Sequence, residues 1–262
     1  MSENARVTRF SGAEWADQLR TVTIIGVGGI GSWLALNLAR IGHSLTLIDP
    51  DVVDQTNVYG GQLYRTADIG RPKVDAVRQI CRELGAGQAI IGFQEPFMPH
   101  HLEGGLVITG LDSMTPRREV YETWAGKIAT GEFNADHSLL VDGRLTMEMF
   151  ECLSVQGNRP DQMVTYDKEY LFTDEEADEL DCTTKQSTFG AMGIAAAITA
   201  TLCNFLTNRK IGDPDFRDVP FYNRMYYPLM GVTRRETETI CQQTEQMEQT
   251  GQEEPSPGIL CP

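Results

Sequence analysis

The chain has 262 residues, of which 41% are apolar, and its formal net charge is −15, from 22 basic and 37 acidic residues. This length and composition predict one large α/β domain, or one domain with an appendage. Because nucleic-acid binding requires a basic face that neutralises phosphates, the negative charge argues against a nucleic-acid partner. It suits a solvated acidic surface or a basic protein partner.

Six cysteines include no Cys-x-x-Cys pair, so the sequence predicts neither the usual zinc site nor a disulfide framework. The N-terminus, MSENARVTRF, lacks the apolar core of a signal peptide. The most apolar segment, Ala191–Leu206, is interrupted by polar residues and is too short to span a bilayer. The four histidines (43, 100, 101 and 137) show no metal-ligand spacing. We therefore expect a cytoplasmic protein with no zinc ion and no membrane partner.

Residues 1–20 are predicted to form an N-terminal arm, with a short helix over Arg6–Leu19. An apolar strand (Thr21–Gly26) then runs into a glycine turn, GVGGIGS, and a helix that ends near Arg40. A second apolar strand, Ser44–Ile48, follows. Strand, helix and strand in this order predict a parallel βαβ unit.

The glycine turn has the spacing of a phosphate-binding loop. Gly26, Gly28 and Gly31 match G-x-G-x-x-G between a strand and a helix. Glycine permits a tight turn and lets backbone N–H groups and the helix N-terminus approach a phosphate. Asp49 follows the second strand, where a carboxylate accepts from ribose hydroxyls. The unit therefore predicts a nucleotide at the carboxyl ends of parallel strands, with a simple packing turn as the alternative.

The stretch after Asp49 carries four polar groups in a set order: Asp51, Asn57, Gln62 and Lys73. Together they supply carboxylates for a metal or a ribose, amides for phosphate and an ammonium group for polyphosphate. Taken singly, Asp51 could cap a turn and Lys73 could be a surface lysine. Their joint order favours a nucleoside triphosphate over a dinucleotide.

These motifs resemble those of the ThiF/MoeB/HesA superfamily, the adenylating core of ubiquitin-activating enzymes. The family pattern GxGGxGS, DxDxVxxxN, Q and GxxK is met by GVGGIGS, DPDVVDQTN, Gln62 and GRPK, and the resemblance covers most of residues 6–206. It implies one adenylation domain over residues 1–235, with a Rossmann-like, mostly parallel sheet that helices flank and antiparallel strands extend. Residues 21–128 would bind the nucleotide, and residues 129–235 would bind a carrier protein.

The nucleotide-binding half is completed by two further helices and two further strands. The helices are predicted over Asp68–Leu84 and Met114–Ile128, where apolar residues recur at helical spacing. The strands are predicted over Ala89–Phe93 and Leu106–Thr109.

The second half shows alternation of apolar and polar residues. It predicts two antiparallel strands, His137–Asp142 and Arg144–Val155, joined by a tight turn at Asp142-Gly143. A small-residue helix (Thr188–Leu206) and a last strand (Phe221–Tyr227) follow. The tail, residues 236–262, is acidic and rich in Gln and Thr, and we expect it to be flexible. Asp142-Gly-Arg144 is either this solvated turn or part of a cleft that threads a peptide tail.

In the resembling family, a carboxylate attacks the α-phosphate of Mg-ATP, which releases pyrophosphate and leaves an acyl-adenylate. The resemblance implies a role for each matching residue. Gly29 would lie against the nucleotide, Asp49 would hold the ribose, and Asn57 and Lys73 would hold phosphates.

The resemblance also assigns the residues that follow the strand Leu106–Thr109. Asp112 would ligate Mg²⁺ near the α-phosphate and is a catalytic candidate, although in isolation it could be an Asx-turn residue. Ser113 stands where the family often has Asn, and Arg117 falls where a helix arginine braces this loop.

The chain departs from the family pattern at two places. Gly60 and Gly61 stand where family members carry an arginine that stabilises the phosphates. Members also often offer an N-terminal arginine across a dimer interface, for which Arg6 and Arg9 are candidates. The side chains available to replace the lost charge are those of Arg9, Arg65 and Arg71.

Cys182 is the candidate nucleophile, because several family members place the cysteine that accepts the acyl group in the same crossing segment. A thiolate would displace AMP, and the nearby Lys185 would favour the thiolate form. The alternative is a half-buried structural cysteine near the start of a helix.

The sequence therefore predicts an adenylyltransferase that uses ATP and Mg²⁺ to activate the C-terminal carboxylate of a ubiquitin-like or sulfur-carrier protein. The resemblance implies a homodimer and leaves room for a downstream conjugating enzyme. The alternatives are a peptide-adenylating enzyme, an inactive ATP-binding scaffold and, least favoured, an NAD-dependent oxidoreductase.

Overall fold

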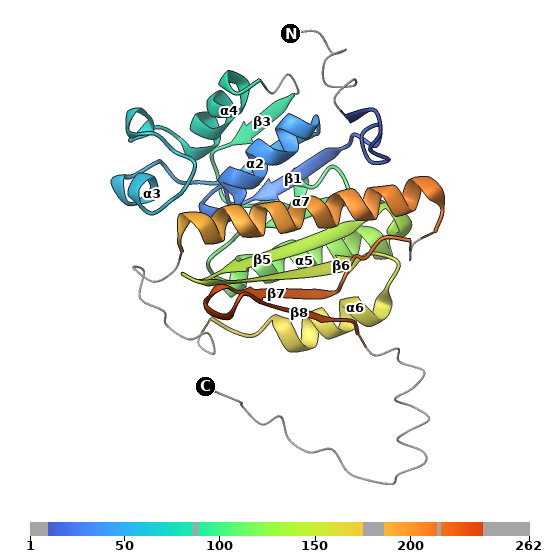
Figure 1. Ribbon diagram of the computed structural model, residues 1–262. Helices are drawn as coiled ribbons and strands as arrows, with labels where there is room; N and C mark the ends of the chain where they lie inside the picture. The colour runs from blue at the N-terminus through green and yellow to red at the C-terminus, as the bar shows by residue number, and fades with distance from the viewer. Residues whose placement is uncertain (1–9, 86–88, 175–185, 214–215, 238–262) are drawn as a thin grey trace, which may run out of the picture.

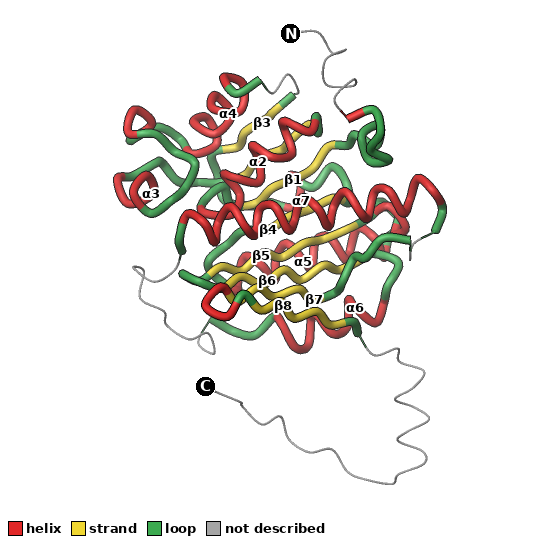
Figure 2. Tube along the Cα trace, in the orientation of Figure 1, coloured by secondary structure: helices red, strands yellow, loops and turns green. Residues whose placement is uncertain are grey.

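The computed structural model describes residues 10–85, 89–174, 186–213 and 216–237 (Figure 1). Eight strands form one mixed sheet in the order β3-β2-β1-β4-β5-β6-β7-β8. The pairs from β3 to β5 are parallel and those from β5 to β8 are antiparallel. Helices lie on both sides of the sheet, with α2, α4 and α7 on one face and α5 on the other (Figure 2). This confirms the predicted fold class.

The nucleotide-binding half matches the sequence prediction closely. Strands β1, β2 and β4 are almost wholly buried because helices cover both faces, so they consist of nearly continuous apolar runs, whereas the edge strand β3 is only partly buried. The strands are β1 (Thr21–Ile25), β2 (Ser44–Ile48), β3 (Ile90–Phe93) and β4 (Leu106–Thr109). The helices are α2 (Gly29–Ile41), α4 (Lys73–Glu83) and α5 (Met114–Ala129).

Some local structure differs from the predictions. The helix expected from Asp68 begins only at Lys73, because Pro72 occupies its N-cap and a short 3₁₀ turn, Thr66–Asp68, precedes it. In the described part of the N-terminal arm, residues 11–20 form turns in place of the expected helix.

Several short elements lie between the predicted ones. They are α3 (Gln55–Tyr59), the 3₁₀ turns η2 (Pro99–His101), η3 (Ala135–His137) and η6 (Tyr227–Leu229), helix α6 (Pro160–Thr165) and the π-helical η4 (Tyr166–Tyr170).

The antiparallel half contains the main correction. Strand β5 (Leu139–Leu145) runs straight through Asp142 and Gly143, so the tight turn predicted there is wrong. The chain reverses after β5 and returns as β6 (Met149–Gln156). Asp142 is fully buried and is neutralised by arginines, which the turn signal of an Asp-Gly pair does not reveal. The sheet ends with β7 (Tyr222–Tyr226) and an edge strand that was not predicted, β8 (Gly231–Arg235).

Helix α7 (Thr188–Ile211) is longer than predicted, with 24 residues. By length and composition it could span a membrane, so the sequence argument that this segment is too short is wrong. Within the described residues, 56% of its most apolar stretch is buried, and its inner face packs against α2, β5 and β6. That burial is characteristic of the core helix of a globular domain.

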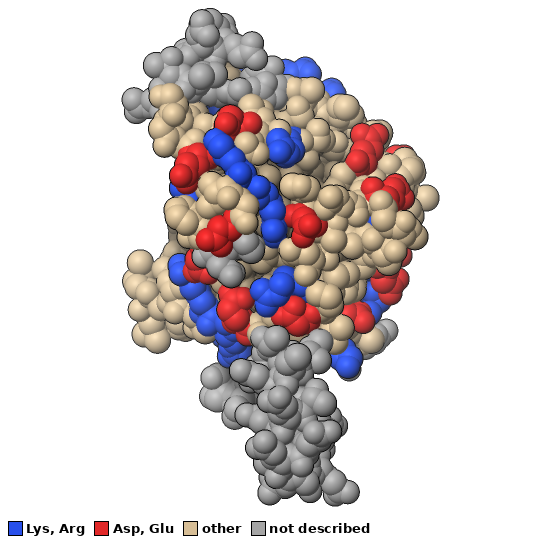
Figure 3. All heavy atoms as spheres, turned by 90° about the vertical axis from the view of Figure 1, so that its right-hand side faces the viewer, with Lys and Arg blue, Asp and Glu red and all other residues tan. Residues whose placement is uncertain are grey.

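Helix α7 also spans the length of the domain. It begins at the end of the sheet that carries the glycine turn and ends where the N-terminal turns lie (Figure 1). There Lys210 Nζ pairs with Asp17 at 2.8 Å, and Arg217 Nη2 pairs with Glu14 at 2.7 Å. Figure 3 shows this end of the molecule, with basic and acidic side chains interspersed. At 1.5 Å per residue, the N-terminal turns lie roughly 35 Å from the start of α7.

The glycine turn closes by backbone contacts that exclude a side chain. A Cβ on Gly31 would lie 1.9 Å from Gly26 O, and a Cβ on Gly26, where φ is +83°, would lie 2.8 Å from Gly110 O. These two glycines are therefore fixed by the packing of β1, α2 and β4, before any ligand is considered.

Two glycines within helices give a test of this closure. We expect Gly31→Ala to lower the free energy of unfolding by about 1–3 kcal/mol, because its methyl group meets backbone that cannot yield. Gly126→Ala, at an exposed position in the last turn of α5 with no atom within 4 Å of its Cβ position, should raise it by about 0.5–1 kcal/mol. Urea titrations followed by circular dichroism measure both, and equal effects would contradict this account.

Candidate nucleotide-binding site

The four glycines of the turn have two different surroundings. Gly26 and Gly31 face inward and close the turn, as described above. Gly28 and Gly29 face the open end of the sheet, where two glutamine amides lie over them. A Cβ on Gly28 would lie 3.8 Å from Gln62 Nε2, and one on Gly29 would lie 2.0 Å from Gln186 Oε1. We call the region bounded by Gly28, Gly29 and these amides the mouth.

Asp49 links the glycine turn to the end of β2. Its Oδ2 accepts from Val27 N at 2.8 Å, and its Oδ1 accepts from Asp51 N at 2.9 Å. Burial raises the pKa of Asp49, and the charge of Lys73 and the two backbone donors oppose that rise. Asp49, the carboxylate predicted to bind the ribose, is therefore held rigidly against the glycine turn at the carboxyl end of β2.

Lys73 and Asp51 form an ion pair beside this carboxylate. Lys73 Nζ lies 2.8 Å from Asp51 Oδ2, and Lys73 N donates to Asp51 O. The lysine side chain is only 9% exposed, whereas that of Asp51 is 62% exposed. Because an ammonium group has three donors and Asp51 takes one, Lys73 retains two that bond no described residue. A buried cation with unused donors is suited to bind a polyphosphate.

Asn57 and Gln62 have different partners. Asn57 lies in the first turn of α3, where its Oδ1 accepts from Asp54 N at 3.0 Å and its backbone N donates to Asp54 Oδ1. This capping box orients the asparagine, and its amide NH₂ group bonds none of the residues that the structure describes. Gln62 Oε1 is buried, and it has no hydrogen-bond partner among the described residues.

The first turn of α7 packs against the double glycine, Gly60-Gly61, that stands at the expected arginine position. At Gly61, φ is +90° and a Cβ would lie 2.3 Å from Thr188 Oγ1. Trp33 Nε1 donates to Gly61 O at 2.8 Å, which fixes this segment to α2. The first turn of α7 therefore packs where the arginine side chain would begin.

Asp112 follows β4 on the other side of the glycine turn. It is exposed and makes no hydrogen bond or ion pair within the described residues. Ser113 is the N-cap of α5, without a capping hydrogen bond from its side chain. Arg117 is buried and donates to Leu111 O, which braces the backbone just before Asp112. The predicted metal ligand is thus an available carboxylate on a fixed loop.

Sequence reasoning missed the buried network beneath this loop. Asp142 Oδ1 accepts from Arg117 Nη1 and, at 3.0 Å, from Thr109 Oγ1. Its Oδ2 accepts from Arg144 Nε at 2.9 Å and from Tyr166 OH at 3.1 Å. Burial would raise the pKa of Asp142, but the charges of Arg117 and Arg144 outweigh it and hold that pKa below its usual value. The available signal was the Asp-x-Arg spacing, which places both side chains on one face of a strand.

Two of the arginines considered as replacements for the family's missing arginine, Arg65 and Arg71, are paired with Asp68. Arg65 Nε lies 2.9 Å from Asp68 Oδ2, and Arg71 Nη1 lies 2.8 Å from Asp68 Oδ1. Asp68 is completely buried, so these guanidinium groups compensate its charge. Arg65 also pairs with Glu83.

Other candidates lie outside the described residues: Arg6, Arg9, Cys182 and Lys185. The described residues that bound the segment of Cys182 each contact an element near the glycine turn or the loop of Asp112. Asp174 Oδ1 accepts from Met114 N at 2.5 Å, at the start of α5 and close to Asp112. Gln186 lies over Gly29.

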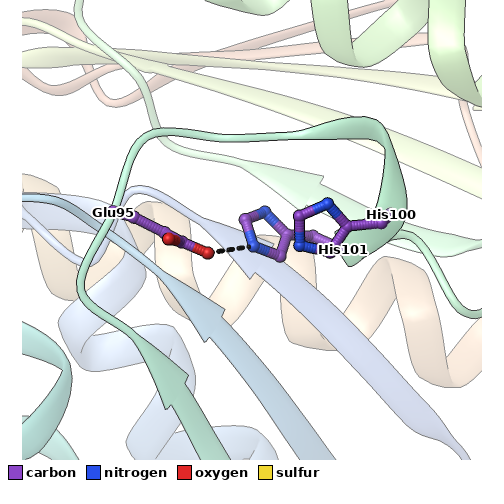
Figure 4. Close-up of side chains that lie close together, drawn as sticks. All are labelled: Glu95, His100 and His101. Atoms are coloured by element: carbon purple, nitrogen blue, oxygen red, sulfur yellow. Dashed lines mark hydrogen bonds and ion pairs between the residues drawn. The ribbon is translucent and has the colours of Figure 1, made fainter.

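One histidine cluster does come together in space. Figure 4 shows His100 and Glu95 beside His101, whose Nε2 lies 2.8 Å from Glu95 Oε1. His101 Nδ1 accepts from Met98 N at 3.0 Å, so the ring proton is on Nε2 and is donated to Glu95. Neither ring nitrogen of His101 then offers a lone pair to a metal. The cluster closes the loop between β3 and β4.

The fold is of the doubly wound α/β class, and its glycine turn lies at the point where the strand order reverses, which is where proteins of this class bind nucleotides. The family model described as "ThiF family" matches residues 2–215. The chain therefore belongs to the ThiF family.

Curated relatives match shorter segments. Adenylyltransferase and sulfurtransferase uba4 of Aspergillus niger is 38% identical over 79 residues, which are 30% of this chain and 16% of that protein. The NEDD8-activating enzyme E1 catalytic subunit of Schizosaccharomyces pombe is 30% identical over 127 residues, which are 47% of this chain and 28% of that protein. The chain thus spans less than a third of the length of either relative.

A solved structure gives broader coverage of the fold. Escherichia coli MccB, crystallised with ATP, superposes with a TM-score of 0.66 at 16% identity. The match covers 90% of this chain and 72% of MccB. At this identity the likeness establishes the shared fold.

Substitution of the buried Asp142 and of the exposed Asp112 should change the free energy of unfolding by very different amounts. Asp142→Asn should lower the free energy of unfolding by about 3–5 kcal/mol, because it leaves two buried guanidinium groups without a carboxylate. Asp112→Asn should change it by less than about 0.5 kcal/mol, because no described contact is lost. Urea titrations at neutral pH measure both, and a tolerant Asp142 would contradict the assigned role.

The pH dependence follows from the lowered pKa of Asp142. A carboxylate whose pKa is lower in the folded than in the unfolded state stabilises fully above its unfolded pKa, about 4. That stabilisation is lost as the pH falls through the folded-state pKa. Wild type should therefore lose stability below about pH 4 more steeply than Asp142→Asn. Parallel acid limbs in the two proteins would count against the network.

Proposed function

We propose that this protein is an ATP-dependent adenylyltransferase that activates the C-terminal carboxylate of a ubiquitin-like or sulfur-carrier protein. One arrangement carries the proposal: a glycine turn with the buried ammonium of Lys73 on one side and the exposed carboxylate of Asp112 on the other. Asp51, which pairs with Lys73, follows β2, and Asp112 follows β4; these two strands flank β1 in the sheet. The named activities of the relatives support the same reaction.

The reaction requires charge neutralisation and alignment, because a carboxylate is a poor nucleophile toward a polyanion. Asp49 positions the ribose, and the turn amides and Lys73 hold the phosphates. Asp112 would hold Mg²⁺, which neutralises charge on the phosphates when it is bound. The carrier carboxylate oxygen then forms a bond to the α-phosphorus, and pyrophosphate leaves. Arg117 and Asp142 keep the Asp112 loop in place.

A second step would transfer the acyl group to Cys182. The thiolate sulfur attacks the acyl carbon, a thioester forms, and AMP leaves with the electron pair. Support comes from the bounding residues Asp174 and Gln186, which lie beside the Asp112 loop and the glycine turn.

A homodimer is also part of the proposal, with an arginine such as Arg9 supplied by one copy to the mouth of the other. Within one chain, residues 14–17 are held at the far end of α7, roughly 35 Å from the start of that helix. Arg65 and Arg71 are engaged with Asp68. We place the protein in the cytoplasm, in keeping with the free cysteines Cys81, Cys152 and Cys203.

Pyrophosphate exchange tests the proposal. Exchange of labelled pyrophosphate into ATP should require a peptide-tailed carrier and should fall about 100-fold or more in Asp112→Ala. Cys182→Ala should retain exchange and lose any thioester. The matched control is Glu103→Ala, which removes an exposed carboxylate before β4, at the opposite end of that strand.

Each alternative has its own outcome in this experiment. Exchange with short peptides and no carrier would identify a peptide-adenylating enzyme. ATP binding without exchange would identify an inactive scaffold, the alternative suggested by the absence of the family's arginine at Gly60 and Gly61. Binding of a nicotinamide dinucleotide in preference to ATP would identify an oxidoreductase and overturn the proposal.

A further inference from the structure

The replacement of an arginine by Gly60 and Gly61 leaves bare backbone in the wall of the mouth. The structure fills this space from α7. Thr188 packs against Gly61, and Gln186 Nε2 lies 3.3 Å from the position of a Cβ on Gly60. A Cβ at position 60 would be excluded mainly by Thr56 O, which would lie 2.5 Å from it, and it would also be tight against Gln186.

The amide of Gln186 reaches both walls of the mouth. Its Oε1 lies 2.0 Å from where a Cβ on Gly29 would stand, and its Nε2 faces Gly60. Within the described residues this amide makes no hydrogen bond, although it is partly buried. A buried amide normally bonds a partner, because an unmade hydrogen bond costs free energy. Gln186 therefore carries an unused donor group, Nε2, beside Gly60, and an unused acceptor, Oε1, against Gly29.

The position of Gln186 is fixed by the residue after it. Ser187 is the N-cap of α7, where its Oγ accepts from Gly190 N at 3.2 Å. The same hydroxyl donates to Met147 O at 2.5 Å, at the turn between β5 and β6. The backbone of Gln186 is thus held next to a capped helix and the sheet, which keeps its side chain between Gly29 and Gly60.

We propose that Gln186 binds the phosphates of the nucleotide through its side-chain amide, in place of the arginine absent at Gly60 and Gly61. This inference rests on the proposed function, since it requires ATP at the glycine turn. An amide donates hydrogen bonds without a full charge, so it contributes less than a guanidinium group would. Gln186 is then a determinant of affinity for the triphosphate. The amide of Gln62 lies beside Gly28 in the same mouth.

A charge series at position 186 tests this role. Dissociation constants of the full chain for MgATP and for adenosine are measured by calorimetry in wild type, Gln186→Ala, Gln186→Glu and Gln186→Arg. Removing one hydrogen bond should weaken MgATP binding about fivefold in Gln186→Ala. Gln186→Glu should weaken it by more than about tenfold through like-charge repulsion, and Gln186→Arg should tighten it.

Adenosine binding should be the same in all four proteins, because the contact is with phosphates. Gln79→Ala, an exposed glutamine on α4, is the matched control and should bind MgATP as wild type does. Thermal melts of each variant report folding. The opposite signs expected for Glu and Arg are not produced by a merely structural role.

The results separate the two proposals. If wild type binds MgATP and the Gln186→Glu and Gln186→Arg variants bind it with the same affinity as each other, the role of Gln186 is overturned and the proposed function is not. Equal weakening of MgATP and adenosine in Gln186→Ala does the same, because it indicates a structural defect. Wild type that fails to bind MgATP overturns both this inference and the proposed function.

Discussion

A single buried carboxylate, Asp142, connects the two halves of this domain. It lies on β5, where the sheet changes from parallel to antiparallel, and bonds arginines from α5 and from its own strand. Taking ions out of water is costly, so the carboxylate and the guanidinium groups are stable there only together. Since Arg117 also holds Leu111 O, this compensation of charge determines where the loop of Asp112 lies.

The mouth combines rigid groups with unused ones. Asp49 accepts from two backbone N–H groups, and Arg117 donates to Leu111 O; these bonds fix the backbone on either side of the glycine turn. Lys73, Asp112 and Gln186 keep donors or acceptors that no described residue uses. Such a division suits transition-state stabilisation, in which the groups that meet the substrate are held in advance by others that do not.

The sequence predicts the parallel half well because there local patterns and tertiary structure agree. The strand before Gly26 and the helix after Gly28 follow from apolar runs and glycine spacing alone. At Asp142-Gly143 the local signal was misleading, because burial and paired charge override turn propensity. Gln186 carried no motif, and only the position of its side chain between Gly29 and Gly60, just before α7, reveals it. Arg9 and Cys182 lie outside the described residues, so their roles stay predictions.

The indole of Trp33 gives the mouth an optical property. Its Nε1 donates to Gly61 O, in the wall beside Gln186, and indole emission responds to changes in local polarity and hydrogen bonding. The chain has three tryptophans. Trp15 lies in the N-terminal turns. Trp124 lies on α5, is wholly buried against the sheet and donates to Gly105 O. Intrinsic fluorescence is thus a native, label-free reporter of events at the glycine turn.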